Sequence, residues 1–222
     1  MTKDKIQPQD ALETAVLNKD NAAVVDLIAE GAFLTRPDVL ATKESFDLNL
    51  AVAELLIESA PCLRNESAVK RLKELDAHYE TLDLVRETAV PPFENDYPKS
   101  GKLIEAICKS DESTIEKLIV DDEVVLYSAD LKIFDNLSVF SEEAAVLLLD
   151  YGVFGRLKAQ IFLALREKAE NGNSERDVLL FETMKIITKE FDSDEREQRI
   201  HELWKKQYIK EIAAEPEMHI VE

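Results

Sequence analysis

The sequence has few of the residues that make turns: only 5 glycines and 7 prolines among 222 residues. An all-β protein of this length needs many more, so the scarcity favours helices. Uninterrupted apolar runs reach only about five residues, whereas a membrane-spanning helix needs roughly 20. No apolar segment follows the first residues, so we expect no signal peptide and a cytoplasmic location.

Cysteine and histidine are also scarce, with 2 and 3 residues. Cys62 and Cys108 make neither a disulfide framework nor a metal cluster, and their apolar helical surroundings predict buried thiols in a reducing compartment. None of the histidines, His78, His201 and His219, has a second histidine at helical spacing, and no phosphate-binding loop or nucleophile motif occurs. The sequence therefore predicts a protein that is not an enzyme and that holds no metal and no cofactor.

The charge is one-sided, with 46 acids against 27 bases and a formal net charge of −19. The excess runs along the whole chain, at −8 for residues 1–95, −7 for residues 96–190 and −4 for residues 191–222. No basic patch can neutralise a row of phosphates, so we expect no nucleic acid and no membrane surface as partner. A basic protein is the partner that this charge favours, although acidity also serves solubility alone.

Two acid-rich segments are candidates for a divalent cation, residues 121–123 and residues 192–195. Neither has the glycine turn and terminal glutamate of an EF-hand loop. The second segment stands at the start of a predicted helix, where acids complement the helix dipole. We interpret both as solvated acids and not as metal sites.

Apolar residues recur at helical spacing along the chain. Two stripes lie within residues 12–16 and 24–28, with Asp20 as the predicted N-cap between them and Gly31 as the predicted C′ residue after the second. Trp204 is expected to pack a final helix, which caps the array, onto the rest. Further helices are predicted over residues 47–59, 67–78, 82–88, 142–151, 156–170, 175–191 and 194–214.

The chain resembles itself when Leu12–Leu40 is aligned with Leu103–Leu131, 91 residues further on. Asp20 then meets Asp111, and Leu27-Ile28 meets Leu118-Ile119, which predicts equivalent buried positions. We interpret residues 10–95 and 101–190 as two copies, joined by the proline-rich residues 91–98. The predicted units are residues 1–95, residues 96–190 and a cap with an acidic tail over residues 191–222. The alternative is that amphipathic helix pairs share Leu and Ala spacing by chance.

The same residues carry a family resemblance. Asp10–Ala15 and Gly101–Ala106 keep the Leu and Ala of the ankyrin signature Thr-Pro-Leu-His-x-Ala, and the second-helix endings at residues 27–32, 55–60 and 147–152 also resemble ankyrin repeats. The Thr-Pro pair is absent, and Glu13 and Ile104 stand in place of the histidine, so stacking has to rely on packing. The resemblance implies an all-α helical repeat, or α-solenoid, made of ankyrin-like helix pairs. A solenoid of tetratricopeptide or HEAT type is the competing interpretation.

These features predict a non-catalytic protein-protein interaction module that binds a macromolecular partner through one face of a helical array. An immunity protein or other inhibitor of a basic toxin, a host-directed effector and a nucleic-acid mimic are the alternatives. The oligomeric state is left open. Loops between helix pairs line one face of a solenoid, so the candidate contacts are the aromatic and charged residues there, although Phe33 and Phe154 fit a role in the core equally well. The candidate partner-binding residues are Phe33, Arg36, Asp38, Tyr127, Asp130, Tyr151 and Phe154.

Overall fold

The computed structural model describes residues 8–35, 48–60, 97–126, 131–135, 137–153, 156–172, 174–189 and 193–214. Within these ranges the secondary structure is helical, apart from one isolated parallel bridge between Leu126 and Val153. The all-α prediction is therefore confirmed for this part of the chain. None of the helices described is long and apolar enough to cross a membrane.

Nine α-helices and two 3-10 turns lie within the described residues. They are α1 (Pro8–Leu17), α2 (Asn21–Ala29), α3 (Leu50–Ser59), α6 (Tyr97–Lys109), α7 (Glu112–Val120), the 3-10 turns η5 (Leu131–Phe134) and η6 (Leu137–Val139), α8 (Glu142–Asp150), α9 (Arg156–Glu170), α10 (Glu175–Lys189) and α11 (Ser193–Ala214). The prediction for residues 156–170 matches α9 at both ends. Those for residues 67–78 and 82–88 lie outside the described residues.

Helix α6 begins earlier than the sequence predicts. The proline-rich connection was expected to reach Pro98, but α6 starts at Tyr97 and includes this proline in its first turn. The first turn tolerates proline because the backbone N–H groups there have no partner within the helix.

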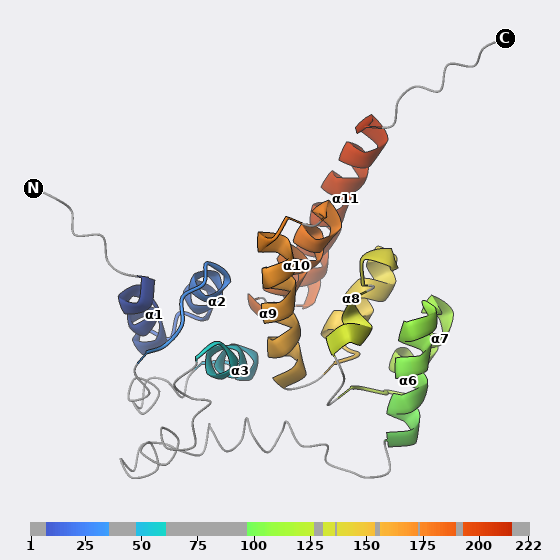
Figure 1. The fold of residues 1–222 in the computed structure, drawn as a ribbon, viewed down its shortest axis with the longest axis horizontal. Coiled ribbons are helices and arrows are strands. Elements are labelled where there is room, and N and C mark those ends of the chain that lie inside the picture. The colour runs from blue at the N-terminus through green and yellow to red at the C-terminus, as the bar shows by residue number, and fades with distance from the viewer. Residues whose placement is uncertain are drawn as a thin grey trace, which may run out of the picture.

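A central hairpin of α9 and α10 separates two sets of three helices (Figure 1). We call α1, α2 and α3 the first triad, and α6, α7 and α8 the second triad. The first triad packs on the hairpin through α3 on α9 and α2 on α10, and the second packs on it through α8 on α10. In a linear array each repeat contacts only its neighbours in the chain, whereas here the first triad contacts helices that follow the second.

Helix α11 also packs on α10. Trp204 is fully buried between them, its indole Nε1–H donates to Thr183 Oγ1 over 3.0 Å, and the Arg176 guanidinium stands 4.2 Å from its ring centroid. A buried indole needs a hydrogen-bond acceptor, and Thr183 supplies it. The prediction that Trp204 packs the last helix onto the chain is confirmed.

The first two helices of each triad are joined by the same turn. Lys19 and Ser110 have positive φ, 59° and 54°, and their N–H groups donate to Val16 O and Ile107 O, both over 3.1 Å. The next residue in each turn, Asp20 or Asp111, caps the following helix with its carboxylate, at (φ, ψ) of (−84°, 84°) and (−87°, 83°). The caps confirm the prediction for Asp20, and equivalent positions differ by the 91 residues of the sequence alignment.

The third helix of each triad is tied to the second in the same way. The backbone N–H of the N-cap Asn49 donates to Asn21 Oδ1 over 3.0 Å, and that of the N-cap Ser141 donates to Glu112 Oε1 over 2.8 Å. Asn21 and Glu112 are both the first residues of their helices. Each triad thus satisfies an otherwise unpaired backbone donor with a side chain about 28 residues earlier.

Two predictions about buried side chains need correction. Cys108 is exposed and not buried, because its position on α6 faces away from Leu103 and Ile107, which lie in the core. Leu27 is only partly buried, whereas its aligned partner Leu118 is 7% exposed. Cys62 lies outside the described residues.

Candidate functional site

An open groove of about 400 Å³ lies where the first triad meets α9 and η5. We call it the acidic groove. Its lining residues come from the end of α2, the end of α3, η5 and one side of α9: Gly31, Ala32, Phe33, Glu58, Ser59, Leu131, Gln160, Leu163, Ala164, Arg166, Glu167 and Glu170.

The end of α2 supplies the aromatic wall of the acidic groove. Gly31 has φ 93°, a conformation that glycine adopts at low cost, and the N–H of Ala32 returns to Leu27 O over 2.9 Å. This turn confirms the predicted C′ glycine and reverses the chain. The next side chain, Phe33, is 37% exposed at the groove, while Ala32 and Leu34 on either side are buried.

Helix α9 supplies the opposite wall. Leu163 and Ala164 lie three and four residues after Gln160, and Glu167 lies four and three residues after them, so these side chains form one stripe along the helix, and all line the groove. Arg166 holds this wall in place, because its Nη1 donates to Ile28 O at the end of α2 over 2.8 Å. The Ile28 carbonyl also accepts from the Gly31 N–H over 3.0 Å, and a cation at a helix C-terminus complements the dipole.

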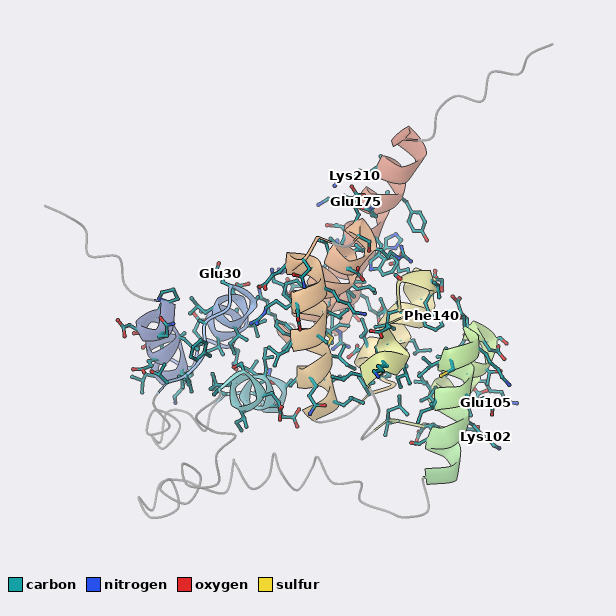
Figure 2. All side chains as sticks on the ribbon, viewed as in Figure 1. Glu30, Lys102, Glu105, Phe140, Glu175 and Lys210 are labelled. Carbon is teal, nitrogen blue, oxygen red and sulfur yellow. The ribbon has the colours of Figure 1, made fainter. Side chains whose placement is uncertain are left out.

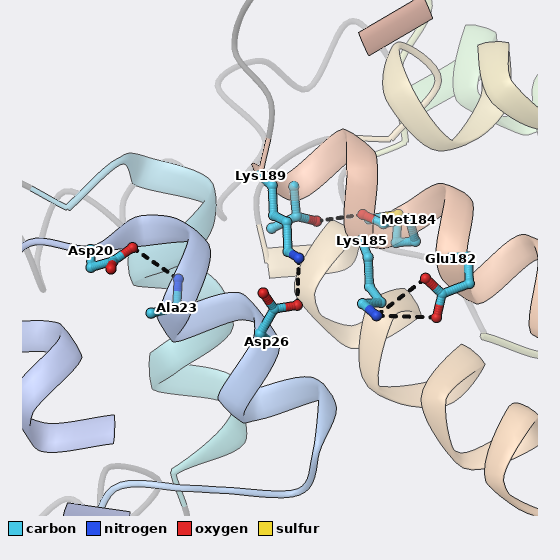
Figure 3. A network of polar contacts seen from close by, with 8 residues as sticks. Asp20, Ala23, Asp26, Glu182, Met184, Lys185 and Lys189 are labelled. Carbon is cyan, nitrogen blue, oxygen red and sulfur yellow. Dashed lines mark hydrogen bonds and ion pairs between the residues drawn. The ribbon is translucent and has the colours of Figure 1, made fainter. Parts of the chain in front are cut away.

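An ion pair also connects the first triad to the central hairpin. Lys189 at the end of α10 pairs with Asp26 on α2, and Figure 3 shows this contact between the two helices. Lys168 on α9 likewise pairs with Asp135 beside η5, over 2.8 Å. Polar contacts therefore join α2 to α9 and α10, and α9 to the residue after η5, around the acidic groove.

Carboxylates outnumber cations in the groove. Glu58, Glu167 and Glu170 line it, and the only cation among its lining residues is Arg166. The guanidinium is already engaged, since it donates to Ile28 O and its Nε lies 3.5 Å from Glu170 Oε1. The groove thus combines apolar side chains with surplus negative charge, a combination that suits a basic segment carrying an apolar anchor.

Tyr151 lies beside a different cluster, at the end of α8. Arg196 on α11 donates to Asp150 Oδ2 over 2.8 Å and to Tyr151 Oη over 3.4 Å, and Lys158 Nζ lies 3.5 Å from Asp150 Oδ1. Burial lowers the pKa of Lys158, while Asp150, and more weakly Glu54 on α3, oppose that shift. Asp150 thus ties the end of α8 to Lys158 on α9 and to Arg196 on α11, which makes the cluster a structural link.

The structure brings one of the predicted contact residues into the acidic groove. Phe33 lines it, whereas Tyr151, although 51% exposed, lies beside the Asp150 cluster and does not line the groove. The other predicted contacts lie outside the described residues: Arg36, Asp38, Tyr127, Asp130 and Phe154.

The sequence reasoning missed the wall formed by α9. Its stripe at residues 160, 163, 164 and 167 has helical spacing, and that signal was visible. What the sequence did not reveal is that this stripe lines the same groove as Phe33, because the two segments lie far apart in the chain and come together only in the folded structure.

No group of three or more His, Cys, Asp or Glu side chains with metal-binding geometry occurs in the part of the chain that the structure describes. The described part of the chain is thus all-helical. It carries an acidic, partly apolar groove between the first triad and the central hairpin. Comparison with family models, with curated proteins and with solved structures finds no match for the chain.

Proposed function

We propose that this chain is a non-catalytic protein-interaction module whose acidic groove binds a basic segment of a partner protein. The observation that carries the proposal is the pairing of apolar side chains with three carboxylates around a single, already engaged arginine. Such a groove attracts a segment with lysines or arginines, and the exposed ring of Phe33 offers an anchor surface.

The two triads support an ankyrin-like interpretation of the architecture. The same turn, the same cap and the same tie to the third helix recur at the spacing of the sequence alignment. We propose that the triads are diverged copies and that the central hairpin joins them into one binding body. Proteins built from repeated helix pairs present extended surfaces to other proteins, which fits the groove.

The net charge of −19 adds long-range steering to the local fit. A basic partner is drawn toward the surface before contact, so salt is expected to lower the association rate more than it raises the dissociation rate. We also propose a cytoplasmic location, with which the exposed free thiol of Cys108 is compatible.

Affinity capture from the native cell, read by mass spectrometry, tests the proposal. We expect the wild type to capture a protein with a basic segment, and the double variant Phe33→Ala, Glu167→Lys to lose it. The matched control is Val139→Ala, Glu116→Lys, which makes the same two kinds of change at exposed positions outside the groove. Equal capture by both variants contradicts the groove as the site.

The identity of the captured protein separates the narrower roles. If the captured protein is a basic toxin, the chain is an immunity-type inhibitor. If it is a nucleic-acid enzyme that DNA displaces from the chain, the chain is a nucleic-acid mimic whose carboxylates imitate phosphates. A substrate turned over by the wild type contradicts the non-catalytic role.

A further inference from the structure

A second groove, separate from the acidic groove, lies between α10 and α11 and has a volume of about 490 Å³. We call it the hairpin groove; its walls are α10 and α11, so it is distinct from the central hairpin of α9 and α10. Residues of its lining are strongly exposed for their type: Ile209 is 57% exposed and Val178 is 43% exposed, with Leu203 half-buried between the helices. Exposed apolar side chains gathered in one groove mark an interaction site more than the same residues scattered singly.

The geometry of α11 explains why this groove is open. Helix α11 has 22 residues and α10 has 15, and Figure 1 shows α11 projecting beyond the body of the molecule toward its C-terminal end. Trp204 anchors its middle part, so the turns after it extend past the core. The apolar face of those turns has no covering helix among the described elements.

The charges around the hairpin groove differ from those of the rest of the chain. Glu175 and Glu182 stand on the α10 wall, while Lys206 and Lys210 stand on the α11 wall, so the lining carries two charges of each sign on a chain of net charge −19. Within the chain, Glu175 accepts from Gln207 Nε2 over 2.9 Å, and Glu182 pairs with Lys185 Nζ over 3.1 Å. Figure 2 shows Glu175 and Lys210 together at this end of the molecule. The segment 203–210 carries three lysines and no acid.

We propose that the hairpin groove is the contact surface for a second copy of this chain. A two-fold axis places the α10 wall of one copy against the α11 wall of the other, so each pair of acids meets a pair of lysines. Helices α10 and α11 of both copies then form a four-helix arrangement, with Val178, Leu203 and Ile209 of each copy at its centre. A strongly basic partner gains nothing here, because the lysine wall repels it.

The proposal predicts the oligomeric state of the full chain. Sedimentation or light scattering over a range of micromolar concentrations should show a monomer–dimer equilibrium for the wild type. Ile209→Glu should weaken dimerisation about tenfold or more, since it places a charge at the centre of the contact. Val120→Glu is the matched control, because Val120 is 59% exposed and does not line the hairpin groove.

Charge exchange tests the two-fold pairing itself. The double variants Lys206→Glu, Lys210→Glu and Glu175→Lys, Glu182→Lys should each dimerise weakly alone and regain dimerisation when mixed. Lys205→Glu, an exposed position on the same helix outside the groove, should leave dimerisation unchanged. Circular dichroism confirms that each variant remains helical.

Three results overturn the proposal: a wild type that stays monomeric over the whole range, equal effects of Ile209→Glu and Val120→Glu, or no recovery on mixing. Each of them points to a different occupant of the hairpin groove. None bears on the acidic groove, whose test is partner capture.

Discussion

The two triads share their turns and caps but differ in how they meet the central hairpin. In the first triad, α3 packs on α9 and places the acids Glu54 and Glu58 at 3% and 6% exposure beside it. In the second triad, α8 packs on α10. The alignment slips by one residue to an offset of 92 in the third helix, so Val146 stands opposite Glu54 and Asp150 stands opposite Glu58. The first triad therefore leaves Glu58 at an open groove, whereas the second triad holds Asp150 in ion pairs with Lys158 and Arg196.

The comparison shows which features the local sequence determines. Turns and caps depend on a few adjacent residues, so they are alike wherever those residues recur. The groove depends on which distant helix a triad meets. The shape of the acidic groove thus depends on the contacts with the hairpin and not on the turns and caps that the triads share.

Emptying aligned core positions should produce the largest effect. Leu12 and Leu103 are both fully buried and lie 91 residues apart. We expect Leu12→Ala and Leu103→Ala each to lower the free energy of unfolding by about 2–5 kcal/mol. Chemical denaturation measures both losses. If the two losses of unfolding free energy differ by more than about 3 kcal/mol, the two positions are not equivalent.

A second pair should separate the triads. Leu118 is 7% exposed, while the aligned Leu27 is only partly buried. We expect Leu118→Ala to cost about 2–5 kcal/mol and Leu27→Ala clearly less, because fewer contacts are lost. Denaturant midpoints give the comparison, provided that both variants keep the wild-type dependence of unfolding free energy on denaturant concentration. A larger loss of stability for Leu27→Ala would contradict the partial burial of Leu27.

The ties between second and third helices should differ because one acceptor is charged. Glu112→Ala removes a carboxylate that accepts the Ser141 N–H, and Asn21→Ala removes an amide oxygen that accepts the Asn49 N–H. We expect about 1.5–3 kcal/mol for Glu112→Ala and about 1 kcal/mol for Asn21→Ala. Glu112→Gln keeps an acceptor and serves as the control. Equal losses at all three would mean that the ties do not stabilise the triads.

The smallest expected effect concerns pH. The Asp111 carboxylate accepts from Thr114 Oγ1 at 2.7 Å, Thr114 N at 3.2 Å and Ser113 Oγ at 3.1 Å, and these bonds lower its pKa. Its contribution is therefore present above the ordinary pKa of 3.8 and is lost as pH falls through the lowered value. Asp111→Asn keeps a good cap and should remove this part of the acid dependence. Unfolding curves of both proteins between neutral and strongly acidic pH measure it.

The sequence predicted the local features well. Helix α9, the Asp20 cap, the Gly31 turn and the burial of Trp204 each depend on residues close in the chain or on one large apolar side chain. Cys108 was wrongly predicted to be buried because its chain neighbours are apolar, whereas on α6 it lies about 100° around the helix from the buried Ile107 and outside the core.

The groove was only partly predictable. Phe33 was identified as a loop aromatic, but Glu58 and the α9 stripe were not, because they become neighbours only when α3 packs on α9. Periodicity reveals that a stripe exists and not which distant segment it faces.

Hydrogen–deuterium exchange of the full chain, alone and with the protein it captures, tests the acidic groove most directly. We expect slower exchange on binding at residues 31–33, at 58–59 and along α9 from Gln160 to Glu170, while α6 and α7 exchange as before. Protection confined to α6 and α7, with the groove unchanged, would contradict the proposal that the partner binds between the first triad and the central hairpin.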